Sequence, residues 1–196
     1  IEKAIEEVMI GREKPERKMN KTELERVAHH EAGHALMGYL LKDSNPPIKV
    51  SILPRGEAAL GFSQPKPTDK KLYTQSYLLA QICVLLGGRV AEKIVYKNYS
   101  SGASDDIEKV TRISKEWFES WGMDPESGPL NYSILDDKFI QKEMIDKIVK
   151  FTKKLEDFTE NTLIDNKDQL INLAQLLLKK ETINYTDINN LLKKDR

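Results

Sequence analysis

The stretch VAHHEAGHAL, Val27–Leu36, contains all three histidines of the 196-residue chain and decides how the remaining sequence is interpreted. Two of them, His30 and His34, flank Glu31 in the pattern H-E-x-x-H. On a helix, side chains four residues apart lie on one face, with Cβ atoms roughly 5–6 Å apart. Two imidazoles at this spacing can hold one zinc ion, and the intervening glutamate can reach a water on that ion. The stretch therefore predicts a helix that carries part of a metal site.

This helix is expected to run from Thr22 to about Leu41, ahead of the breaker cluster DSNPP. The segment TELE predicts a capping box in which Thr22 caps the helix and Glu25 reaches back. His29 points about 100° away from His30 around the axis, so we interpret it as a surface or hydrogen-bonding histidine. The alternative to a metal site is a pair of partly buried histidines that only make hydrogen bonds.

A catalytic zinc usually takes three protein ligands and a water. The third ligand should be a carboxylate, because no histidine remains and the single cysteine, Cys83, lies in an apolar run and is expected in the core. The candidates are Asp105 and Asp106, at the start of a predicted helix, and Glu92 in GGRVAEK. Spacing does not rank them, and acidic residues in a first turn also simply compensate the helix dipole.

The rest of the sequence predicts a mainly α fold with a small β-hairpin or sheet beside the H-E-x-x-H helix. IKVSILP alternates apolar and polar residues and ALGFSQ follows the turn PRGE, so both are expected to be strands. Gly87 and Gly88 would weaken a helix by about 1 kcal/mol each, so we expect another backbone to pack close to them. Further helices are predicted at 74–96, 104–121, 140–166 and 168–180, with a short one near Thr186.

One of these helices carries an apolar stripe that we assign to the core or to a subunit contact rather than to a cofactor site. The stripe consists of Met144, Ile148, Phe151, Leu155 and Phe158.

Charge and composition exclude some functional classes. Thirty-one basic and 31 acidic residues give a formal net charge of zero, so there is no electrostatic reason to expect nucleic acid as a partner. No apolar run approaches the roughly 20 residues that span a bilayer, so this fragment is expected to be soluble. The sequence has no G-x-x-x-x-G-K-[ST] motif for nucleotide phosphates. Because it begins with Ile1 and not Met, we expect a fragment of a longer chain or a processed product.

Four ordered segments resemble the peptidase domain of the FtsH family, which are membrane-bound, ATP-dependent zinc proteases. They are VAHHEAGHA, KVSILPRGEAALGFSQ, LGGRVAEKIVY and SSGASDDIEKVT. The resemblance covers nearly the whole chain, and PRGEAALGFSQ followed by LYT is most similar to the mitochondrial m-AAA branch. It implies that residues 1–20 are the tail of a preceding ATPase module with its linker, and that residues 21–196 form the zinc peptidase domain.

The resemblance also implies the roles of individual residues. Zinc would be bound by His30, His34 and Asp106, with Glu31 as the catalytic base that activates the zinc-bound water. Glu92 would lie beside the site and orient a ligand histidine. His29 stands where the family usually has tyrosine, a departure that is expected to alter only local packing. ATP would be used by a module that this fragment lacks.

The implied function is a zinc endopeptidase within a membrane-anchored, hexameric, ATP-dependent protease for protein quality control, either homo- or hetero-oligomeric. Its substrates would be unfolded or membrane polypeptides, added along the edge of a strand containing Val50, Ser51 and Ile52 through main-chain hydrogen bonds. The expected location is the mitochondrial inner membrane, with bacterial and plastid membranes as alternatives. The competing functions are a catalytically silent assembly module of the same ring and a freestanding soluble metalloprotease.

Overall fold

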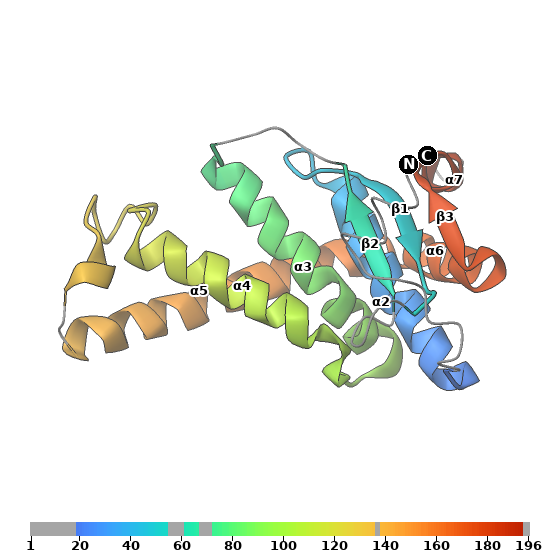
Figure 1. The fold of residues 1–196 in the computed structure, drawn as a ribbon, viewed down its shortest axis with the longest axis horizontal. Coiled ribbons are helices and arrows are strands. Elements are labelled where there is room, and N and C mark those ends of the chain that lie inside the picture. Colours follow the sequence, from blue (N-terminus) through green and yellow to red (C-terminus); the bar gives the residue numbers. More distant parts are fainter. Residues whose placement is uncertain (1–18, 55–60, 67–71, 136–137, 194–196) are drawn as a thin grey trace.

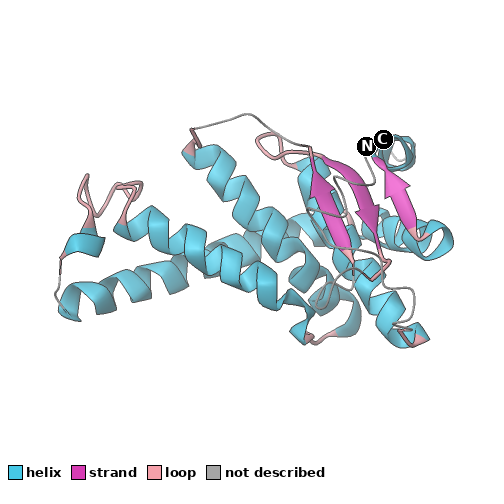
Figure 2. Cartoon of the chain, viewed as in Figure 1, coloured by secondary structure: helices cyan, strands magenta, loops and turns pink. Residues whose placement is uncertain are grey.

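A computed structural model of the chain describes residues 19–54, 61–66, 72–135 and 138–193. The fold is mainly α with one small antiparallel sheet, as predicted (Figures 1 and 2). The expected N-terminal helix tail and most of the PRGE turn lie outside the described residues. The described elements are α2 (Lys21–Leu40), β1 (Pro47–Ser51), β2 (Phe62–Pro65), α3 (Gln75–Tyr96), η1 (Ser101–Ala103), α4 (Ser104–Glu119), η2 (Tyr132–Ile134), α5 (Lys138–Asp165), α6 (Lys167–Lys180), β3 (Thr182–Asn184) and α7 (Tyr185–Lys193).

The histidine helix α2 has a capping box, but two residues earlier than predicted. The Asn20 side chain accepts a hydrogen bond from the Glu23 backbone N–H at 2.9 Å, and Glu23 accepts one from the Asn20 N–H at 3.1 Å. The predicted box of Thr22 and Glu25 is therefore wrong. Asparagine is as good an N-cap as serine or threonine, and its glutamate partner has the same spacing, so the helix begins at the earlier cap.

Helices α2 and α3 pack with their backbones in contact. A Cβ on Gly33 would lie 2.3 Å from the carbonyl oxygen of Gly87, and a Cβ on Gly87 would lie 2.7 Å from the carbonyl oxygen of Gly33. Real Cβ atoms do not approach this closely, so both positions require glycine. The close backbone approach predicted at Gly87 is confirmed, and it brings α3 onto the face of α2 that carries the histidines.

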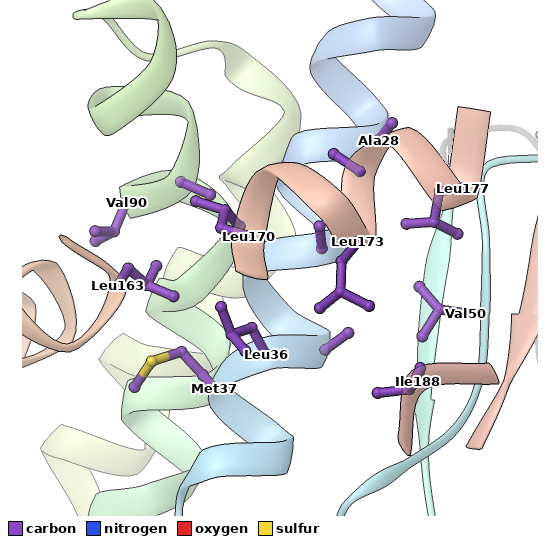
Figure 3. Packing of buried hydrophobic residues seen from close by; sticks show 14 of the residues in the cluster. Ala28, Leu36, Met37, Val50, Val90, Leu163, Leu170, Leu173, Leu177 and Ile188 are labelled. Carbon is purple, nitrogen blue, oxygen red and sulfur yellow. The ribbon is translucent and has the colours of Figure 1, made fainter. Parts of the chain in front are cut away.

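The main core packs around α2 with side chains from α3, α5, α6, α7 and β1 (Figure 3). Leu36 of α2, Leu170 and Leu173 of α6, Val50 of β1 and Ile188 of α7 are all fully buried. Burial of a Leu, Ile or Val side chain contributes about 1.5–3 kcal/mol to stability. Because α3 and α6 both pack against α2, the histidine helix is held from two sides.

The sheet has the order β2-β1-β3, with β1 in the centre. Val50 is opposite Ser63 of β2 and opposite Ile183 of β3, and both pairings are antiparallel. The two strands predicted from the sequence are present, whereas β3 was not predicted. Figure 1 shows the sheet beside α2, with β3 next to α6 and α7.

Helices α4 and α5 extend away from the sheet and share a second cluster of buried side chains (Figure 1). Phe151 packs against Trp117 and Phe118, with ring centroids 5.2 and 5.3 Å apart. The predicted stripe on α5 is therefore mainly core, with Met144 buried, although Phe158 at its end is 50% exposed. No helix in the described part of the chain, α5 with its 28 residues included, is both long and apolar enough to cross a membrane.

Candidate metal centre

Three side chains from α2 and α4 converge on one point. The Nε2 atoms of His30 and His34 lie 3.0 Å apart, and Oδ2 of Asp106 lies 3.4 Å from the first and 3.3 Å from the second. Ligand atoms at 2.0–2.1 Å from one tetrahedral zinc are roughly 3.3–3.4 Å apart. Among the described residues these three form the group whose spacing suits a metal ion.

Hydrogen bonds at the opposite ring nitrogens determine which tautomers face the site. Nδ1 of His34 lies 2.7 Å from the Val84 carbonyl oxygen, which can only accept, so this nitrogen carries a proton. Nδ1 of His30 lies 2.8 Å from Oε1 of Glu92 and donates to that carboxylate. In the neutral imidazoles both Nε2 atoms therefore direct lone pairs at each other and at the Asp106 carboxylate. A proton or a metal ion among these three atoms relieves the repulsion of their lone pairs, and a zinc ion fits this donor set.

The close contacts in the site shift the pKa values of Asp106, His30 and Glu92. Burial raises the pKa of Asp106, but the charges of His34 and His30 and their hydrogen bonds outweigh it, so the pKa is lowered. Burial lowers the pKa of His30, yet the hydrogen bonds to Asp106 and Glu92 raise it to about 10. Burial also raises the pKa of Glu92, but hydrogen bonds from His30, Arg26 and Ser100 lower it to about 2. The site is thus an anionic pocket that draws positive charge onto His30.

Gly88 of α3 leaves room beside the donor atoms. A Cβ at this position would lie 2.5 Å from Nε2 of both His30 and His34. Any larger residue would occupy the space that the two lone pairs face. The prediction that another backbone packs close at Gly88 is wrong, because its neighbours are the side chains of His30 and His34 in the candidate metal centre.

Glu31 lies beside the three donors and is buried. Its side chain is buried with 6% residue exposure, and within the described residues its Oε2 has no hydrogen-bond partner. Burial raises the pKa of this carboxyl, opposed by the charges of His34 and His30. A Cβ on Gly61, the residue before β2, would lie 2.8 Å from Oε1 of Glu31. Glu31 is therefore enclosed between the histidine helix and the start of β2.

The other residues considered from the sequence, Asp105, Glu92 and His29, do not join the three converging atoms. Asp105 is 79% exposed and forms an ion pair with Lys109 at 2.8 Å, and Glu92 contacts His30 rather than the converging atoms. His29 lies on a different face of α2, where its Nδ1 is 2.8 Å from the Glu25 carbonyl oxygen. The interpretation of His29 as a hydrogen-bonding histidine is confirmed.

The expected substrate contact along β1 is wrong. Val50 and Ser51 are paired on both sides, with β2 and with β3, and the Ile52 N–H donates to the Glu181 carbonyl oxygen at 3.0 Å. All three residues are at most 1% exposed. A peptide cannot add to a strand whose two edges are occupied. In the described sheet the strands at the edges are β2 and β3.

Sequence reasoning missed three residues that support the site. The Val84 carbonyl gave no signal because any residue type could supply it. Ser100 donates to Oε1 of Glu92 at 2.9 Å, and Arg26 donates to Oε2 at 2.8 Å. The one available signal was that Arg26 precedes His30 by four residues and so shares its helix face.

Comparison with known proteins agrees with this geometry. Residues 17–191 match the peptidase family M41. The chain is 37% identical over 210 residues to ATP-dependent zinc metalloprotease FtsH 3 of Petrotoga mobilis, covering 99% of this chain and 33% of that protein. It is 39% identical over 202 residues to the mitochondrial inner membrane m-AAA protease component yta12 of Schizosaccharomyces pombe, covering 98% and 26%. The chain thus spans a quarter to a third of these relatives. The resemblance to the FtsH family is confirmed, and the chain belongs to peptidase family M41.

Proposed function

We propose that this chain is the zinc endopeptidase domain of an ATP-dependent protease, with zinc held by His30, His34 and Asp106. The observation that carries the proposal is the convergence of three donor atoms whose lone pairs face one another in a buried pocket. Relatives named ATP-dependent zinc metalloproteases support it. Glu92 is proposed to hold His30 in the tautomer that presents Nε2 to the metal.

The proposed reaction is peptide-bond hydrolysis with Glu31 as the proton carrier. Bound zinc supplies Lewis-acid chemistry, which polarises a carbonyl and lowers the pKa of a water. Glu31 accepts a proton from the attacking water and returns it to the leaving amine, so that its charge is restored at the end of each turnover. Burial raises the pKa of its carboxyl, which makes it a stronger base than an exposed glutamate.

The substrate is proposed to bind as an extended polypeptide beside β2 rather than β1. β2 lies at the edge of the described sheet, and Gly61 at its start is in contact range of Glu31. Strand addition uses main-chain hydrogen bonds, which suits unfolded chains of varied sequence. Residues such as Ser63 and Gln64, on this strand, are the expected neighbours of the peptide backbone.

The setting of the whole protein is also a proposal. We infer that the full-length protein is anchored in a membrane and forms a hexameric ring in which an ATPase module delivers membrane or unfolded proteins for quality control. The names of relatives support this setting, one being a component of a mitochondrial inner membrane m-AAA protease and another an ATP-dependent FtsH. Light scattering on the full-length protein tests the ring, which a strictly monomeric species would contradict.

The deciding experiment for the enzyme is Glu31→Gln, which keeps the shape of the side chain but removes the base. We expect zinc content to stay at the level of the unmodified protein, while digestion of an unfolded protein falls by about 10²–10⁴-fold. Metal analysis and peptide release are measured on the same samples. Undiminished digestion would remove Glu31 as the base. Absence of digestion in the unmodified protein would favour a catalytically silent assembly module.

A further inference from the structure

Arg26 lies one turn before His30 on α2, and its guanidinium is engaged on several sides. Nη1 donates to Oε2 of Glu92 at 2.8 Å, and Nη2 donates to the Asn98 side-chain oxygen at 2.9 Å. Its central carbon lies 4.4 Å from the centroid of the Tyr96 ring. The Arg26 side chain is 24% exposed. It is therefore held by a charge-assisted hydrogen bond, a neutral hydrogen bond and a ring face at once.

The carboxylate of Glu92, which Arg26 contacts, is held by hydrogen bonds at both of its oxygens. Glu92 is 1% exposed and receives hydrogen bonds from three side chains, with Arg26 on Oε2 and both His30 and Ser100 on Oε1. A buried carboxylate without a cation is strongly disfavoured, and removal of one partner of a buried pair costs more than removal of a surface charge. Arg26 thus fixes the direction in which Glu92 accepts from His30.

The same arginine also reaches the segment that leads to the third donor. Asn98 follows α3, and Ser100 caps the short helix η1, where its Oγ accepts from the Gly102 N–H at 3.2 Å. Helix α4, which carries Asp106, begins directly after η1. Arg26 and Glu92 therefore link the helix with the two histidines to the turn that places the carboxylate.

We propose that Arg26 is a positioning residue for the metal centre. Through Glu92 it keeps His30 oriented with Nε2 toward the site, and through Asn98 it holds the 97–103 turn so that Asp106 faces the two imidazoles. This inference rests on the proposed zinc site. It predicts that loss of the guanidinium loosens the donor set even though Arg26 touches none of the three donor atoms.

The test compares Arg26→Met, which keeps the aliphatic stem, with Arg26→Lys and with a matched control. Lys147→Met is the control, because Lys147 also pairs with a carboxylate, Asp124, at 3.3 Å and donates to the Ser127 hydroxyl at 2.7 Å, both outside the 97–103 turn. Its side chain is 23% exposed, similar to Arg26 at 24%. Each protein is stripped of metal, and its zinc dissociation constant is measured by competition with a chromophoric chelator. The visible spectrum of the Co²⁺-loaded form and the Tm are recorded in parallel.

Because Arg26 acts through Glu92, the outer partner of His30, we expect Arg26→Met to weaken zinc binding by about tenfold, the lower end of the effect of losing such a partner, and to change the Co²⁺ spectrum. Arg26→Lys should recover part of the affinity, because an ammonium still pairs with Glu92. Lys147→Met should leave the zinc affinity within about twofold of the unmodified protein and the Co²⁺ spectrum unchanged. On a Glu92→Gln background, Arg26→Met should add less than it costs alone, because only its contact with Asn98 is left to lose.

Three results overturn the inference. Unchanged zinc affinity and Co²⁺ spectrum in Arg26→Met would remove Arg26 from the site, and an equal loss in Lys147→Met would show a general effect of stability. If Arg26→Met does not fold, Asn98→Ala at the exposed end of the network is measured instead, and an unchanged affinity there contradicts the link to the turn. Failure of the unmodified protein to bind zinc would instead reject the proposed function itself.

Discussion

Asp105 and Asp106 are neighbours at the start of α4 and meet different surroundings. Asp105 is 79% exposed and pairs with Lys109, a helix-surface interaction worth about 0.3–0.5 kcal/mol. Asp106 is 16% exposed and faces the Nε2 atoms of His30 and His34. One step along a helix turns the side chain by about 100°, which is enough to separate a solvated carboxylate from one inside the site.

At this scale the two aspartates can be tested against each other. Asp106→Asn removes a charge that offsets two histidines and a metal ion, so it should weaken zinc binding by more than the roughly 10–100-fold cost of an outer partner. Asp105→Asn should leave zinc binding unchanged. Zinc content after dialysis against a chelator measures both. The reverse order would move the third donor by one residue.

At the scale of elements, the pairing of α2 with α3 both stabilises the fold and shapes the site. Gly33 and Gly87 bring the two backbones into contact, whereas Gly88 lies against the imidazoles. The neighbouring residues Gly87 and Gly88 thus serve two purposes: Gly87 lets the two helices pack closely, and Gly88 leaves space beside the imidazoles. Because α3 also supplies the Val84 carbonyl and Glu92, its distance from α2 determines the tautomers of both histidines.

Two alanine substitutions should separate these purposes. Gly88→Ala places a methyl group 2.5 Å from both Nε2 atoms, so we expect zinc binding to be lost, while helix propensity improves by about 1 kcal/mol. Gly33→Ala places a methyl group against the Gly87 backbone, so overpacking should lower the free energy of unfolding by about 1–3 kcal/mol or more. Urea unfolding without metal and zinc titration are measured on both. Normal zinc affinity in Gly88→Ala would contradict the assigned position of the metal.

At the scale of the whole molecule, the sheet determines where a polypeptide can approach the site. β3 comes from the C-terminal part of the chain and closes one edge of β1, while β2 closes the other. The strand that remains at the edge next to Glu31 is β2, which is preceded by Gly61. The proposed approach of substrate thus depends on segments more than 100 residues apart, such as Ser51 and Thr182, which lie opposite each other.

A proline scan through an extended substrate peptide tests addition to β2. Alternate residues of a strand direct their N–H groups to the same neighbour, and proline has no N–H. Cleavage should therefore fall when proline occupies every second position near the scissile bond and recover at the positions between. Alanine at each position is the control, and the cut sites are identified by mass spectrometry. A uniform effect without this alternation would reject strand addition.

The elements that could be predicted from the sequence are those defined by local signals. The i, i+4 spacing of His30 and His34 needs only a helix, and the apolar periodicity placed α3 to within one residue of its N-cap, Thr74. The cap of α2 was predicted two residues late because Asn20 and Thr22 both begin box-like patterns. The three-residue strand β3 was missed because so short a segment has no periodicity of its own.

By itself, the sequence determined the helix, the two histidines on one of its faces and the need for a carboxylate, because backbone geometry and a count of donor types suffice for these. Only the tertiary structure separated Asp106 from Asp105 and Glu92 by geometry, enclosed Glu31, and placed β1 in the centre of the sheet. Those outcomes depend on contacts between residues 62–76 positions apart around His30, and on strand partners farther still. Such contacts arise from packing, which no local pattern contains.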